Sequence, residues 1–129
     1  MTELSTVLYV EDDLDIQEVA RLALEVVGRL HVDVASSGAE AVALAQRSIP
    51  DLVLLDVMMP GMDGPTTFAA LREIPGMQAV PVIFVTAKVQ ANEIQQYLDL
   101  GAVGVIAKPF DPMTLADQAR ELWAASRDA

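Results

Sequence analysis

The stretch PDLVLLDVMMPGMDG, residues 50–64, decides the fold of this chain. Its apolar run at residues 52–55 has the length of a β-strand, and Pro60-Gly61 turns the chain shortly afterwards. A strand that is apolar on successive residues is buried on both faces, so it belongs in the middle of a sheet covered by helices. Asp56 follows this run directly and is therefore predicted at the carboxyl edge of the sheet, where ligands bind in open α/β sheets.

The rest of the chain alternates short apolar runs with helical patterns. Helix signals include the capping-box spacing from Ser37 to Glu40, a cap at Asp63, and helix stops at Gly28 and Gly101. This alternation predicts right-handed crossovers and a doubly wound α/β fold with helices on both faces of a five-stranded parallel sheet, in the flavodoxin-like order 2-1-3-4-5. The predicted strands are residues 7–10, 32–34, 52–55, 81–86 and 103–107.

The helical patterns also predict which side chains face the core. The last helix is expected to begin at Asp111-Pro112, because proline is tolerated in a first turn. The inward residues, taken from helical spacing, are Ile16, Val19, Ala20, Ala23, Val26 and Val27 in the first helix, Phe68 and Leu71 in the third, Ile94, Tyr97 and Leu98 in the fourth, and Leu115, Ala119, Leu122 and Trp123 in the last.

Length and composition limit the classes of protein to which the chain can belong. Its 129 residues, 53% of them hydrophobic, suit one domain with a proper core. The absence of cysteine excludes disulfides and thiolate metal sites. The net charge of -11 argues against nucleic acid or an anionic membrane as a direct partner. No apolar segment approaches the ~20 residues needed to span a bilayer, so a cytoplasmic location is expected.

Polar side chains follow four of the predicted strands. The first strand ends at Glu11-Asp12, the third at Asp56, the fourth at Thr86 and the fifth at Lys108. The carboxyl ends of parallel strands share one edge of the sheet, so these groups are expected to converge. Clustered carboxylates repel one another unless a cation lies among them, and an all-oxygen site suits Mg²⁺. A lysine and a hydroxyl beside the metal would suit a phosphoryl group.

Each of these residues also has a simpler interpretation. An acidic pair after a strand commonly caps a helix, and Asp13 can serve as that cap. Thr86 alone is typical of a helix entry, and Lys108 alone of a surface charge. Asp56 is harder to explain in this way, because an acid at the end of an apolar central strand must be paired, metal-bound or exposed in a crevice.

The chain resembles the receiver domain of two-component response regulators over about residues 6–125. Each motif alone is weak, whereas all of them in order and at receiver-like spacing are highly specific. The matching motifs are Glu11-Asp12, Asp56-x-x-Met59-Pro60-x-Met62-Asp63-Gly64, Pro81-Val82-Ile83-x-Val85-Thr86-Ala87, Gly101-Ala102 and Lys108-Pro109-Phe110.

This resemblance implies a phosphorylation-dependent signalling switch. Asp56 would accept a phosphoryl group from a phosphohistidine on a sensor histidine kinase or a histidine phosphotransfer protein. Mg²⁺ would be held by Asp12, Asp56 and the backbone carbonyl of Met58, with Glu11 acting largely through water. Thr86 would be the switch hydroxyl and Lys108 the partner of phosphate and carboxylate, followed by a cis peptide bond to Pro109. A downstream protein would bind the face formed by the fourth helix, the fifth strand and the last helix.

One position departs from the family pattern. Receivers usually carry an aromatic residue three positions before the lysine of the fifth strand, and this chain has Val105 there. The phosphoacceptor chemistry does not depend on that position, but the usual coupling of Thr86 to the output face does. How the switch works without the ring stays open.

Other functions also fit a strand-end aspartate on this fold. An aspartyl-phosphate phosphatase would carry a second aspartate as general acid at the position of Met58. A flavin-binding module would not place Glu11-Asp12-Asp13 where a phosphate must bind. A degenerate, unphosphorylated receiver scaffold is the third alternative. For the favoured receiver, the sequence predicts a single domain over residues 1–129, without an output domain and not an enzyme in the ordinary sense.

Overall fold

β3 (Leu52–Asp56) is the middle strand of the sheet, as its unbroken apolar run predicts. The structure is a computed structural model that describes residues 3–127. Within these residues the strand order is β2-β1-β3-β4-β5 and all pairs are parallel, which confirms the predicted topology. The other strands are β1 (Thr6–Val10), β2 (His31–Ala35), β4 (Val82–Thr86) and β5 (Gly104–Ala107).

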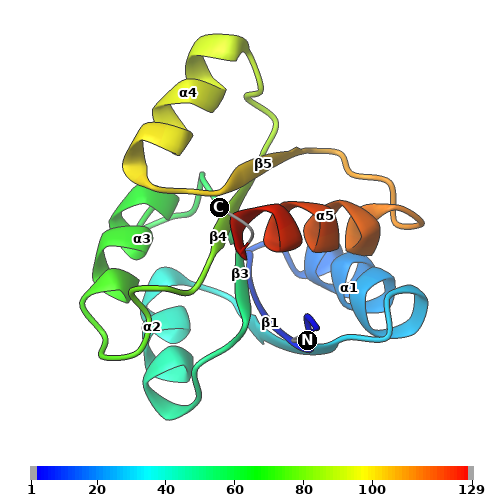
Figure 1. The fold of residues 1–129 in the computed structure, drawn as a ribbon, viewed down its shortest axis with the longest axis horizontal. Coiled ribbons are helices and arrows are strands. Elements are labelled where there is room, and N and C mark those ends of the chain that lie inside the picture. The colour runs from blue at the N-terminus through cyan, green and yellow to red at the C-terminus, as the bar shows by residue number, and fades with distance from the viewer. Residues whose placement is uncertain (1–2, 128–129) are drawn as a thin grey trace.

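Helices cover both faces of this sheet (Figure 1). One face carries α1 (Leu14–Leu22), its π-helical continuation η1 (Ala23–Val27) and α5 (Leu115–Arg127). The opposite face carries α2 (Gly38–Arg47), α3 (Gly64–Arg72) and α4 (Ala91–Leu100). Among the described residues, no helix combines the length and the apolar character needed to cross a bilayer.

Alternating side chains of β3 supply both hydrophobic cores. Leu52 and Leu54 pack into the core beneath α1 and α5, whereas Val53 and Leu55 pack into the core beneath α2, α3 and α4. Because successive side chains of a strand point to opposite faces, Asp56 continues the series of Leu52 and Leu54. The acid therefore projects on the side of the sheet that α1 and α5 cover.

The first helix buries only part of the predicted face. Ala20 and Ala23 are buried as predicted, whereas the prediction that Val19, Val26 and Val27 face the core is wrong, because they are 43%, 68% and 43% exposed. The buried face also contains Leu24 and the polar Gln17, which an apolar-only template cannot find. The π-helical turn, in which the Gly28 N–H donates to the Ala23 carbonyl, adds a further rotation of the side chains.

Two smaller predictions about the later helices also need correction. Leu98 of α4 is 38% exposed, so only Tyr97 of the predicted trio is buried. Regular helix in α5 begins at Leu115 and not at Asp111-Pro112. Turns occupy residues 112–114, although the Leu115 N–H already donates to the Asp111 carbonyl.

The other predicted helix ends are confirmed. The side chains of Asp13, Ser37 and Asp63 accept hydrogen bonds from backbone N–H groups in the first turns of α1, α2 and α3. Gly101 ends α4 with φ of 114°, a left-handed conformation that glycine adopts without steric cost.

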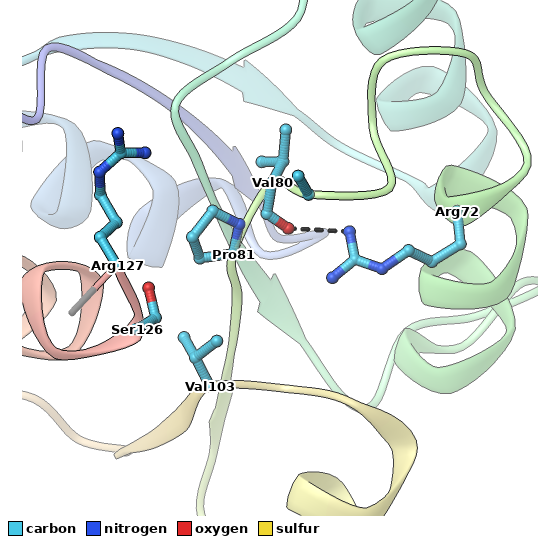
Figure 2. A pocket seen from close by; sticks show the side chains of 7 residues that line it. Arg72, Val80, Pro81, Val103, Ser126 and Arg127 are labelled. Carbon is cyan, nitrogen blue, oxygen red and sulfur yellow. Dashed lines mark hydrogen bonds between the residues drawn. The ribbon is translucent and has the colours of Figure 1, made fainter. Parts of the chain in front are cut away.

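Arg72 holds the connection between α3 and β4 at the opposite edge of the sheet from Asp56. Its Nη1 donates to the carbonyls of Met77 (2.6 Å) and Val80 (2.8 Å), and its guanidinium lies 4.7 Å from the centre of the Phe68 ring. Figure 2 shows the bond to Val80 at the wall of a cavity of about 340 Å³ that Arg127 also lines. Since its Nη1 is engaged with two backbone carbonyls of this loop, Arg72 serves the loop as a structural residue.

Candidate functional site

Three carboxylates meet at the carboxyl edge of the two central strands. Glu11 follows β1 and Asp56 ends β3, and the pairing of Val10 with Leu55 places these acids side by side. One oxygen from each of Glu11, Asp12 and Asp56 lies within 4.8 Å of the others. Glu11 is 1% exposed and Asp56 is 5% exposed, whereas Asp12 is open to solvent. The predicted convergence of the acids is therefore present, with one open side.

Lys108 brings a positive charge to the two buried acids. Its Nζ lies 2.5 Å from Glu11 Oε1 and 3.1 Å from Asp56 Oδ1. The end of β5 is held against β4 because the Lys108 N–H donates to the Thr86 carbonyl at 2.9 Å. The Lys108–Pro109 peptide bond is cis, as the resemblance implies. The resemblance implies that Lys108 is a partner of phosphate and carboxylate without saying which carboxylate, and the structure gives it both Glu11 and Asp56.

The local electrostatics follow from burial and from these contacts. Burial raises the pKa of Glu11 from its ordinary value of 4.5 to about 7, and the neighbouring Asp56 adds to this effect while Lys108 opposes it. For Lys108, burial lowers the pKa, but the hydrogen bonds to Glu11 and Asp56 outweigh burial and the net shift is upward. The lysine therefore stays charged, and the three carboxyl groups of the site outnumber the one positive charge that could neutralise them.

The raised pKa of Glu11 predicts how the stability of the metal-free protein depends on pH. Between about pH 4.5 and pH 7 the folded chain binds a proton at Glu11 that the unfolded chain has lost, so the free energy of unfolding falls as pH rises through this window. The shift from 4.5 to about 7 corresponds to roughly 3 kcal/mol, at about 1.4 kcal/mol for each pH unit. Urea unfolding in EDTA, repeated at several pH values in this window, measures the change in the free energy of unfolding.

Glu11→Gln is the matched control for that pH dependence. The amide cannot titrate, so the variant should lose the Glu11 contribution and show a flatter curve between pH 4.5 and 7. Equal slopes in the wild type and the variant would show that other carboxylates carry the dependence.

Thr86 ends β4 at the same edge but has another partner. It is buried, and its Oγ1 accepts a hydrogen bond from the Lys88 N–H at 3.1 Å. Within residues 3–127 no hydrogen bond joins its hydroxyl to the acids or to Lys108. Val105, where the family carries an aromatic ring, is half-buried and packs against the core beneath α2, α3 and α4. The role of Thr86 as a switch hydroxyl stays a prediction.

Gln17 supports the acidic edge and was missed in the sequence. It is buried in α1, and its Nε2 donates to the Glu11 carbonyl at 2.5 Å and to Ser36 Oγ at 2.9 Å. Its amide thus ties the end of β1 to the loop that follows β2. The sequence did contain one indication of its position: Gln17, Ala20 and Leu24 have i, i+3 and i+7 spacing and therefore share a helix face, which is the buried one.

Gly64 closes the loop that follows Asp56. Its N–H donates to the Val57 carbonyl at 2.9 Å, and a Cβ at this position would lie 2.5 Å from the Asp56 carbonyl oxygen. Asp63 caps the helix that starts here, through its Oδ1 and the Thr66 N–H at 2.8 Å. Burial is slight at Asp63, and these hydrogen bonds hold the pKa of its carboxyl below the usual range. The backbone of the strand end is therefore packed directly against α3.

The donor set fits a hard divalent cation. Oxygen ligands of this kind suit Mg²⁺, which commonly uses one or two carboxylates together with water and phosphoryl oxygens. The exposed Asp12 leaves the cluster open on one side, so water and a ligand could complete a coordination shell. Met58 lies two residues beyond Asp56 with an exposed side chain, and its carbonyl stays a predicted ligand.

An apolar pocket of about 440 Å³ lies beside Lys108. It is formed between α1 and the segment that follows β5, with Ile16, Val19 and Phe110 among its lining residues. The exposure of Val19, noted above, places an apolar surface next to the charged site. A partner that reaches Asp56 from this side would find both an apolar surface and the lysine.

Comparison with known proteins gives one consistent result. The family model for the response regulator receiver domain matches residues 7–120. A response regulator of Synechocystis sp. is 36% identical over 132 aligned positions, which cover all of this chain and 57% of that protein. The response regulator PleD of Caulobacter vibrioides is 41% identical over 91 positions, covering 70% of this chain and 20% of its own length.

Solved structures agree with the sequence relatives. The chemotaxis response regulator CheY4 of Vibrio cholerae has a TM-score of 0.85 and 30% identity, and the match covers 92% of this chain and 98% of that one. The signal receiver domain of a signal transduction histidine kinase from Syntrophus aciditrophicus has a TM-score of 0.80, with 30% identity and coverage of 97% and 94%.

Proposed function

The chain belongs to the family of response regulator receiver domains, the phosphorylation-dependent switches of two-component signalling, and on this basis we propose that Asp56 is its phosphoacceptor. The observation that carries the proposal is the contact of Lys108 Nζ with both Asp56 and Glu11 inside a three-carboxylate cluster. Mass spectrometry after incubation with acetyl phosphate and Mg²⁺ tests it directly.

The proposed reaction transfers a phosphoryl group from a phosphohistidine to Asp56. A carboxylate oxygen of Asp56 forms the new bond to phosphorus while the bond from phosphorus to the donor imidazole breaks, and the electron pair of that bond stays on the imidazole nitrogen. The product is an acyl phosphate on Asp56. Lys108 holds Asp56 in position and supplies positive charge close to the phosphoryl oxygens, so catalysis consists mainly of positioning and electrostatic stabilisation. Self-catalysed loss of the group to water would use the same residues.

We assign metal binding to Glu11, Asp12, Asp56 and the backbone carbonyl of Met58. Bound Mg²⁺ would neutralise negative charge shared between the acids and the phosphoryl oxygens. Asp12 is the exposed member of the cluster, so its carboxylate can exchange water for a metal ion without first being buried. Glu11 and Asp56 are already desolvated and held by Lys108, so their positions are set before a ligand arrives.

The proposed partners act at different surfaces. A sensor histidine kinase or a histidine phosphotransfer protein would deliver the phosphoryl group, and the apolar pocket between α1 and the segment after β5 lies beside the lysine it must approach. A downstream protein would bind the face of α4, β5 and α5. Phosphorylation adds about 1.5 to 2 negative charges, and Thr86 at the end of β4 would respond to them as the switch hydroxyl.

The geometry favours a switch over a hydrolase. Met58 stands two residues after Asp56, where an aspartyl-phosphate phosphatase carries its second aspartate, so the general acid of that class is missing. Glu11, Asp12 and Asp13 likewise place negative charge where a flavin phosphate would bind.

The metal assignment predicts a thermal response. Millimolar Mg²⁺ should raise the melting temperature of the wild type by several degrees, because a ligand that binds only the folded state stabilises it. Asp12→Asn should lose most of this increase, since the variant removes the exposed charge while the Lys108 contacts with Glu11 and Asp56 remain. Differential scanning calorimetry with and without the cation gives both values.

The control for the metal experiment is Asp13→Asn. Asp13 neighbours Asp12 but caps α1, and asparagine caps helices about as well as aspartate. This variant should respond to Mg²⁺ as the wild type does. An unchanged response in Asp12→Asn would remove Asp12 from the site.

A further inference from the structure

Tyr9 carries a buried hydroxyl that has no hydrogen-bond partner. The residue lies in β1 with 1% of its surface exposed, and among residues 3–127 its hydroxyl is the one fully buried side-chain polar atom without a partner. Leaving a buried hydroxyl unsatisfied costs free energy, and phenylalanine would fill the same space without that cost. The hydroxyl therefore calls for an explanation beyond packing.

The position of Tyr9 in the sheet relates it to the acidic site. It precedes Glu11 by two residues, so both side chains leave β1 on the same face. Tyr9 pairs with Leu54 in the register of β1 and β3, and Asp56 lies two residues beyond Leu54 on that face. Tyr9 thus occupies the layer directly beneath Glu11 and Asp56, under α1 and α5.

The two acids also act on the ionisation of the Tyr9 hydroxyl. Burial raises the pKa of Tyr9 far above its ordinary value, and Glu11 and then Asp56 raise it further. The hydroxyl therefore stays protonated at every physiological pH and can donate a hydrogen bond.

Glu11 has its own donor in the present arrangement. Lys108 Nζ lies 2.5 Å from Glu11 Oε1, and the Asp13 N–H donates to Glu11 Oε2 at 3.3 Å. If Lys108 turns to a phosphoryl group on Asp56, Glu11 Oε1 loses its strongest partner inside a buried site. On the same face of the sheet, Tyr9 is the buried residue whose hydroxyl has no partner, and it can supply a replacement donor.

We propose that Tyr9 is a positioning residue whose hydroxyl donates a hydrogen bond to the Glu11 carboxylate when Lys108 leaves it. The Tyr9 hydroxyl has no partner while Lys108 binds Glu11, and it gains one when Lys108 turns to the phosphoryl group. Its hydrogen bond therefore stabilises the arrangement in which Lys108 has left Glu11. This inference rests on the proposed function only for the event that moves Lys108. The exchange of donors itself can be tested without phosphorylation.

A double-mutant cycle separates Tyr9 from Lys108. In the otherwise wild-type chain, Tyr9→Phe should raise the melting temperature by about 2–5 °C, because it removes an unsatisfied hydroxyl. In a Lys108→Met background the hydroxyl has gained Glu11 as acceptor, so the same substitution should lower the melting temperature. Thermal melts of the four proteins in EDTA at pH 8 give both differences and their coupling.

Tyr97→Phe is the matched control, because Tyr97 is the other tyrosine and lies in α4 against the opposite core. Its effect should be the same with and without Lys108. A Tyr9→Phe effect of equal sign and size in both backgrounds would overturn the proposal.

A second measurement covers the case in which Lys108→Met does not fold. A tyrosine hydroxyl that gains an acceptor shifts its near-ultraviolet absorbance to longer wavelength, so phosphorylated protein should show a red shift that Tyr9→Phe abolishes and Tyr97→Phe retains. Phosphorylated wild type without a Tyr9-dependent shift overturns the donor exchange. Failure of the wild type to take up a phosphoryl group would instead contradict the proposed function, and wherever Lys108→Met folds the thermal cycle decides the role of Tyr9 independently.

Discussion

Asp56→Asn is expected to abolish phosphorylation of this protein. The wild type should gain one phosphoryl group when incubated with acetyl phosphate and Mg²⁺, and the variant should gain none. The reason is chemical, because an amide has the size of the carboxylate but lacks the nucleophilic oxygen charge that attacks phosphorus. Intact-protein mass spectrometry reports the stoichiometry directly.

The variant should remain folded, so that loss of labelling reports on chemistry. Lys108 keeps its contact with Glu11 at 2.5 Å when Asp56 is neutral, and removal of one of two adjacent buried acids relieves repulsion. Asp63→Asn is the matched control, since Asp63 lies in the same loop and acts as a helix cap. It should be labelled like the wild type. Stoichiometric labelling of the Asp56→Asn variant would contradict the assignment of Asp56 as the phosphoacceptor.

Gly64→Ala is expected to destabilise the fold strongly and to displace Asp56. The added Cβ would lie 2.5 Å from the Asp56 carbonyl oxygen and 2.8 Å from the Val57 Cα, and backbone atoms of a central strand cannot move aside cheaply. Overpacking of this kind costs about 1–3 kcal/mol and occasionally more. Because the clash falls on the phosphoacceptor's own backbone, the rate of phosphorylation should fall as well. Urea unfolding and a labelling time course measure the two effects.

Gly61→Ala distinguishes packing from backbone conformation at this loop. Gly61 has a left-handed φ of 79°, but a Cβ there would meet nothing within 4 Å. Its substitution should cost about 1 kcal/mol through backbone strain and leave the phosphorylation rate near that of the wild type. If Gly64→Ala is no more damaging than Gly61→Ala, the close approach of α3 to Asp56 does not constrain the site.

The helix faces show where local pattern fails. Spacing alone placed Val26 in the core, yet it is 68% exposed, because a π-helical turn rotates this end of the helix and Gln17 takes an inward position. A polar side chain is stable inside only when it finds partners, and those of Gln17 are the Glu11 carbonyl and Ser36. The helical spacing of Gln17 with Ala20 and Leu24 is visible in the sequence, but the two partners that make the inward position stable are brought to Gln17 only by the fold.

The sequence by itself determined the strand order, the helix caps and the edge at which Glu11, Asp12, Asp56, Thr86 and Lys108 gather. Strand periodicity and cap chemistry are local properties of the sequence. The common edge of the strand ends follows from the right-handed connections between parallel strands. Only the tertiary structure decided the pairing inside that edge. Lys108 binds Glu11 as well as Asp56, and the Tyr9 hydroxyl is left without a partner. These outcomes depend on distances of a few ångströms between side chains far apart in the sequence, and those distances are set by how the strands and helices pack together.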